Sequence, residues 1–113
     1  MQRRDWVILT KIVDEINIAA EMTAGVEFSD FNSSETLKRA LCMTAINIGE
    51  LVKGLSTEFR LKYSHIPWKS IAGFRDIAAH KYQSLRMTDV YNAVILDFPE
   101  LKKNIEEVLK SEQ

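Results

Sequence analysis

The densest group of chemically capable side chains lies between Gly73 and Tyr82 and includes Arg75, His80 and Lys81. An arginine keeps its charge at any working pH and can hold two phosphate oxygens, whereas a histidine titrates near neutrality and can take or give a proton. Such a pair suits RNA cleavage without a metal. In that reaction the ribose 2′-hydroxyl attacks the adjacent phosphorus, which requires a proton carrier and a cation for the charge of the transition state. Lys81 could add to that positive charge.

Helix geometry limits how these side chains can meet. Residues five apart are rotated by about 140° on an ideal helix, so Arg75 and His80 would not share a face of an unbroken helix. Either the helix unwinds near Ala79, or the two side chains meet across an interface between subunits. Arg75 and Tyr82, seven positions apart, would lie within about 20° of each other if the helix continued. The spacing leaves these arrangements open.

The same residues also have an ordinary structural interpretation. Arg75 and Asp76 could bridge neighbouring helices, His80 could end a helix, and Tyr82 could belong to the core. Spacing alone favours this interpretation, because ion pairs that only stabilise a fold are common. A structural role is likewise expected for Gly49-Glu50, where the glycine would permit close helix packing and the glutamate would neutralise Arg75 across the bundle.

Other kinds of catalytic site find little support in the sequence. Two histidines and one cysteine cannot supply the usual zinc ligand sets, and no EF-hand, phosphate-binding glycine loop or dinucleotide motif is present. Cys42 lies between Leu41 and Met43 in a helical stretch, where a buried, inert thiol is the expected outcome. We therefore expect no metal and no cofactor.

Length and composition predict one folded domain over residues 1–113 and argue against an all-β fold, and the apolar periodicity described below makes the domain all-α. The chain is 46% hydrophobic and 27% charged, and its four glycines and two prolines are too few for the turns of an all-β fold. A single cysteine excludes an internal disulfide and suits a reducing compartment. No apolar run approaches the ~20 residues of a membrane span, and the first residues do not resemble a signal peptide. These features together predict a cytoplasmic protein.

Charge is distributed unevenly along the chain. The net charge is −1, but the segment from Arg60 to Thr88 holds six basic residues and one acidic residue, giving +5 there and −6 elsewhere. A basic segment on an otherwise acidic protein can concentrate a polyanion at one place. Pairing of these charges with acidic helices is the alternative.

Periodic apolar residues predict an antiparallel bundle of four to five helices. The first would run from Asp5, as N-cap, to Thr23, and a second of about six turns would begin at Asn32 or Ser33. Ser56 would cap a short third helix, and Pro67 would open a fourth running toward Ala79. The last would begin at Thr88 and be kinked by Pro99. Trp68 is expected to anchor the core or an interface, and His65 to lie in a loop.

The string Arg75-x4-His80-x-Tyr82 resembles the Arg-x4-His-x-Tyr signature of HEPN-domain toxins of the HepT-like kind. The Ile48-Gly49-Glu50 stretch is similar to that family's Ile-Gly-Glu helix, and the stretch from Ile66 to Gly73 is similar to its Pro-Trp, Ile-x-Gly lead into the signature. This likeness extends from the first helix to the kink at Pro99.

The resemblance implies a HEPN-like, homodimeric, metal-independent endoribonuclease, neutralised by a minimal nucleotidyltransferase (MNT) antitoxin in a type II or VII system. Arg75 and His80 would be catalytic, with Asp76 and Lys81 in support. Asp76 departs from the asparagine more usual in relatives. Tyr82 would correspond to the residue that the antitoxin modifies with AMP, which would block RNA by bulk and negative charge. The alternative is a non-catalytic HEPN module that only binds a nucleotidyltransferase.

Overall fold

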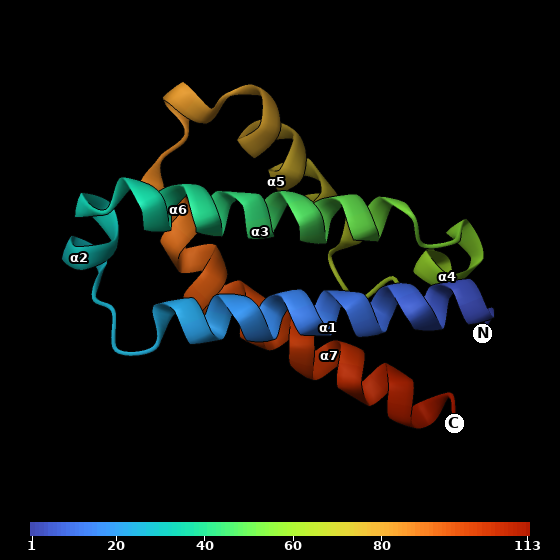
Figure 1. Cartoon of the computed structure of the whole chain (residues 1–113). Helices are drawn as coiled ribbons and strands as arrows, with labels where there is room; N and C mark the ends of the chain where they lie inside the picture. The colour runs from blue at the N-terminus through green and yellow to red at the C-terminus, as the bar shows by residue number, and fades with distance from the viewer.

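The computed structural model describes all 113 residues, and every regular element in it is helical. The longer helices are α1 (Arg3–Thr23), α3 (Glu35–Lys53), α5 (Trp68–His80) and α7 (Phe98–Ser111), and the short α6 (Met87–Asn92) precedes α7. Figure 1 shows α3 between α1 and α5, with α1 and α3 antiparallel and α7 packed along α1. The prediction of an all-α bundle is confirmed.

The core is formed by apolar side chains that recur every three or four residues on one face of each long helix, as amphipathic helices require. Together they form one connected cluster, and the polar residues of the same helices face outward. No helix of the chain is long and apolar enough to cross a membrane. The central members of the cluster are Leu9, Ile12 and Ile16 from α1, Leu41, Ile48 and Val52 from α3, and Leu101, Ile105 and Val108 from α7.

The segment before α3 differs from the sequence prediction. A six-residue helix, α2 (Phe28–Ser33), begins where no helix was predicted, and α3 is capped by Ser34, whose hydroxyl accepts from the Leu37 amide at 3.1 Å. A cap at Asn32 or Ser33 was therefore wrong. The short helix is stabilised by tertiary contacts, because Phe28 and Phe31 pack on the Tyr91 ring with centroid distances of 5.4 and 5.3 Å.

The start of α1 is tied to the start of α4 (Thr57–Lys62) by a buried carboxylate. Asp5 lies inside the first turn of α1 and is 1% exposed, so its prediction as the N-cap was wrong. Its carboxylate accepts from the Ser56 amide at 2.8 Å and from the Ser56 hydroxyl at 2.7 Å. That hydroxyl in turn accepts from the Phe59 amide, which confirms Ser56 as the cap of α4.

The last helix is continuous but changes its winding before Pro99. Between α6 and α7 lies a π-helical turn, η2 (Ala93–Asp97), in which the Phe98 amide bonds back to the Ala93 carbonyl. A proline removes one hydrogen bond and its ring crowds the carbonyl four residues earlier, here that of Ile95. The wider turn thus lies directly before Pro99, and the kink predicted there stays a prediction. Helix formation starts at Met87, one residue before the predicted Thr88.

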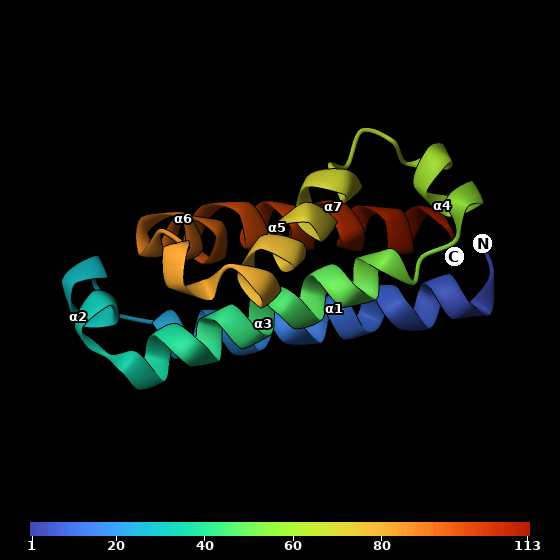
Figure 2. The same cartoon turned by 90° about the horizontal axis from the view of Figure 1, so that it is seen from above.

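Both ends of the chain lie beside α4, as the two views in Figures 1 and 2 agree. Glu112, just beyond α7, accepts hydrogen bonds from Lys62 at 2.7 Å and from the Tyr63 hydroxyl. These two hydrogen bonds lower the pKa of Glu112 from its ordinary value of 4.5 to about 2, and the bond from Lys62 contributes most. The ionised carboxylate therefore fastens the end of α7 to α4.

Replacing Glu112 with glutamine should lower stability at neutral pH, because the ionised form of this group is favoured by folding. A depressed pKa contributes stability that is fully present above about pH 4.5 and is lost as pH falls toward 2. The unfolding free energy of Glu112→Gln should accordingly vary less with pH in that window than that of the parent. Urea titrations between neutral pH and pH 3 measure this, and Glu107→Gln, which removes an exposed acid from α7, should behave like the parent.

Candidate functional site

The helix that carries the candidate residues is anchored at its first turn. α5 begins at Trp68, one residue after Pro67, whose carbonyl accepts from the Ile71 amide at 3.1 Å. The Trp68 side chain is buried, packs on Phe59 at 5.9 Å between ring centroids, and donates to the Tyr63 carbonyl at 3.1 Å. The expectation that Trp68 anchors the core is confirmed, and this anchor sets the position of α5.

A glycine lets α3 and α5 approach closely at Arg75. A Cβ atom built on Gly49 would lie only 2.2 Å from the Arg75 Cβ and 3.2 Å from the Ile71 carbonyl oxygen. Any side chain at position 49 would therefore push the two helices apart. The structural role expected for Gly49 is confirmed, and the same contact brings the Arg75 side chain against the surface of α3.

Arg75 is held between two carboxylates, one from each helix. Its Nε lies 2.8 Å from Glu50 Oε2, and its Nη1 donates to Asp76 Oδ1 at 3.1 Å. The Nε hydrogen is not aimed at the Glu50 oxygen, so that contact is an ion pair without a hydrogen bond. Glu50 thus neutralises Arg75 across the bundle, as expected. The arginine side chain as a whole is 24% exposed, although its Nε atom is buried.

Lys53 is a member of the site that the sequence analysis missed. Its Nζ binds the Asp76 oxygen that Arg75 also binds, at 2.7 Å. These hydrogen bonds, first from Lys53 and then from Arg75, lower the pKa of Asp76. The sequence feature that could have identified Lys53 is its position three residues after Glu50. That spacing places both side chains on one side of α3. Two cations and two anions therefore form a cluster with no net charge.

His80 is the last residue of α5 and is exposed, as is Lys81. The helix runs unbroken from Arg75 to His80, so the unwinding near Ala79 that would have joined them does not occur, and no hydrogen bond or ion pair connects the two side chains. Asp76 lies four residues before His80, hence on the same side of the helix. Because Arg75 reaches toward Asp76, its guanidinium is drawn toward the face that carries His80.

Tyr82 lies apart from Arg75, because the helix ends before it. At Lys81 the backbone turns to φ −132° and ψ 36°, and a short 3₁₀ turn, η1 (Tyr82–Ser84), follows. The Tyr82 hydroxyl donates to Glu35 Oε1 at 3.2 Å, at the start of α3. Glu35 and Glu50 are separated by fifteen residues, about 22 Å of helix. The pKa of Tyr82 is raised, mainly because the side chain is partly buried and also because the Glu35 carboxylate is nearby.

Cys42 is buried in α3, and burial raises the pKa of its thiol. A thiol in that state is a poor nucleophile. The predicted burial of this cysteine is confirmed.

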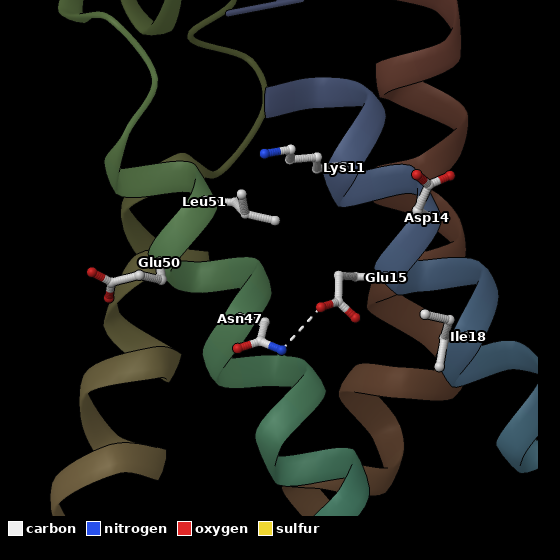
Figure 3. A pocket seen from close by; sticks show the side chains of 7 residues that line it. All are labelled: Lys11, Asp14, Glu15, Ile18, Asn47, Glu50 and Leu51. Atoms are coloured by element: carbon white, nitrogen blue, oxygen red, sulfur yellow. Dashed lines mark hydrogen bonds between the residues drawn. The ribbon is translucent and has the colours of Figure 1, made fainter. Parts of the chain in front are cut away.

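A groove of about 450 Å³ lies between α1 and α3 beside the Arg75 cluster. Three of its side chains are acidic, namely Asp14, Glu15 and Glu50, and Asn47 donates to Glu15 at 2.9 Å across it. Figure 3 shows that Glu50 points out of this groove toward α5. The groove therefore shares only Glu50 with the cluster, and its three acids against the single cation Lys11 give it the wrong charge for a phosphate.

Comparison with known proteins adds the following findings. A family model described as "Ribonuclease HepT-like" matches residues 12–108. "Putative RNase TTE0752" of Caldanaerobacter subterraneus is 37% identical, covering 93% of this chain and 94% of its own length. "Putative RNase MJ1216" of Methanocaldococcus jannaschii is 32% identical over 97% and 92%. "Gamma-glutamylcyclotransferase and putative RNase MJ0434" of the same organism is 36% identical over 97% of this chain but only 50% of its own length. No solved structure matches.

The crossing at Gly49 yields a stability prediction with an internal control. Gly49→Ala should destabilise the fold by up to about 2 kcal/mol, because the overlap with Arg75 costs about 1–3 kcal/mol and the helix gains only roughly 1 kcal/mol when alanine replaces glycine. Gly73→Ala, where the added Cβ meets nothing within 4 Å, should be neutral or stabilising by up to about 1 kcal/mol. Chemical denaturation measures both, and equal stability of the two variants would contradict the assigned contact.

Proposed function

The chain belongs to the HepT-like ribonuclease family, and from that premise we propose that it is the endoribonuclease toxin of a toxin-antitoxin pair, with Arg75 and His80 as its catalytic residues. The observation that carries the proposal is the arrangement around Asp76. This carboxylate draws the Arg75 guanidinium toward the face of α5 on which His80 follows one turn later. This contact brings the phosphate binder nearer to the side of α5 that carries the proton carrier.

The reaction follows from the properties of these two side chains. Arg75 binds the scissile phosphate and offsets the negative charge that develops on it, and His80 transfers the proton to or from the 2′-hydroxyl or the leaving oxygen. No metal is required for either role. Lys81, exposed beside His80, and Lys53, beside Asp76, add positive charge that holds the RNA.

A second copy of the chain completes the proposed site. Arg75 and His80 leave an unbroken helix in directions about 140° apart, so one α5 presents them imperfectly to a single phosphate. In a homodimer with two α5 helices facing each other, arginine and histidine of different copies meet in a shared cleft. The oligomer that the proposal requires is therefore a symmetric dimer.

In this proposal, a nucleotidyltransferase antitoxin of the MNT type inhibits the toxin by adding AMP to Tyr82. The position of this residue supports the assignment, since Tyr82 follows the two exposed residues His80 and Lys81 directly. A bulky anion there would repel RNA approaching Lys81.

A non-catalytic module that binds a nucleotidyltransferase is the second candidate, and the balanced charges of the Arg75 cluster favour it. With Glu50 and Asp76 matching Arg75 and Lys53, the site attracts polyanions less than its basic residues alone would. Salt distinguishes the two functions. RNA binding should weaken steeply as ionic strength rises, whereas an apolar protein interface should not.

Replacing His80 with alanine should reduce RNA cleavage by at least about 100-fold, because a general acid–base group typically contributes that much. Cleavage of fluorescent single-stranded RNA in buffer with EDTA measures the rate and also tests independence of metal. His65→Ala is the matched control, since this exposed histidine lies outside the site. Full activity of His80→Ala, with the oligomeric state unchanged, would remove the catalytic assignment.

Replacing Asp76 with asparagine should tighten RNA binding by about two- to fivefold, because Lys53 and Arg75 lose a shared counter-ion at a partly exposed site. Titration of a 2′-O-methyl RNA, which cannot be cleaved through its 2′ oxygen, gives the dissociation constant. Asp14→Asn removes the same charge from the α1–α3 groove and should have little effect. Weaker binding by Asp76→Asn would mean that the carboxylate positions Arg75 more than it competes with phosphate.

A further inference from the structure

Tyr82 lies in a group of charged side chains that RNA cleavage does not use. Its hydroxyl donates to Glu35 Oε1, and the Arg39 Nε donates to the same oxygen at 2.9 Å. The Lys38 ammonium lies 3.3 Å from Glu35 Oε2. The Arg39 guanidinium also lies over the Tyr82 ring, 5.3 Å from its centroid. Two cations and the tyrosine hydroxyl thus converge on one carboxylate.

This arrangement has the parts of a phosphate site. Arginine and lysine side chains that hold an anion beside a hydroxyl can hold a phosphate attached to that hydroxyl. Lys38 is only 20% exposed, so water competes for its ammonium less than for that of a fully exposed lysine. The cluster also lies at the first turn of α3, where the helix dipole favours negative charge.

We propose that Lys38 and Arg39 form a binding site for the phosphate that nucleotidyl transfer attaches to Tyr82, a site that Glu35 occupies in the unmodified chain. The inference rests on the proposed function, because it describes how the modified tyrosine is held. In the transfer, the Tyr82 oxygen bonds to the α-phosphorus of ATP as the bond from that phosphorus to the β-phosphate oxygen breaks. Pyrophosphate leaves, and the hydroxyl proton is lost to water.

Modification exchanges one anion for another at this site. The ester oxygen of Tyr82 has no hydrogen to donate, so its bond to Glu35 is lost, and the new phosphate repels the Glu35 carboxylate. Lys38 and Arg39 then pair with the phosphate. The modified side chain stays at the start of α3, beside Lys81, and obstructs RNA there while the Arg75 cluster stays intact.

The experiment places phosphotyrosine at position 82 by genetic code expansion and follows its phosphate by phosphorus NMR during a pH titration. Cations beside the phosphate favour its dianion, so its pKa should be about half a unit lower in the parent chain than in Lys38→Met/Arg39→Met. Glu35 and Cys42, the other titratable groups around this ring, are the same in both proteins. Equal pKa values in the two proteins would overturn the proposal.

Three further proteins complete the design. Lys103→Met/Lys110→Met removes two exposed lysines from α7 and should leave the phosphate pKa at its parent value. Lys38→Met and Arg39→Met alone should each give part of the shift, which preserves the test if the double variant fails to fold. The titration needs neither RNA cleavage nor a nucleotidyltransferase. If the chain lacked nuclease activity, the proposed function would be wrong. The pKa difference would still show whether Lys38 and Arg39 bind the phosphate.

Discussion

The close crossing of α3 and α5 at Gly49 is the constraint on which the site depends. Without a side chain at position 49, the two helices approach until the Arg75 Cβ fills the space that a Gly49 Cβ would need. Glu50 and Lys53 then come within reach of Arg75 and Asp76, because they share that side of α3. A wider crossing would leave the guanidinium in solvent with many rotamers, so packing between backbones is what gives Arg75 a defined position.

The electrostatics of the site reflect a compromise between stability and substrate binding. An arginine at a helix crossing loses part of its hydration, and carboxylates on both helices compensate for that loss. In the function we propose, the same carboxylates would compete with an incoming phosphate. Balanced charges make the ligand-free cluster more stable and less attractive to other polyanions, at the expense of the affinity for RNA that the proposal requires.

Much of the fold could be predicted from sequence, because apolar periodicity and the Ser56 cap are local signals. The helix α2 could not, since it depends on rings that meet Tyr91 from far along the chain. At the site, the roles of Gly49 and Glu50 were predicted correctly from their types and neighbourhood. Lys53 was missed, and the distance of Tyr82 from Arg75 was left open, because both depend on where α5 ends and how it crosses α3. The assignment of Arg75 and His80 as catalytic stays a prediction.

The backbone turn at Lys81 has a consequence for how such a protein can change over time. His80 and Tyr82 are two positions apart, yet one belongs to α5 and the other is fastened to the first turn of α3. Substitutions around Glu35 can therefore retune the reactivity of the tyrosine while the histidine keeps its surroundings. For the toxin we propose, a lineage can therefore adapt the tyrosine to a new inhibitor while the proposed chemistry at the histidine is kept, because separate parts of the scaffold support the two residues.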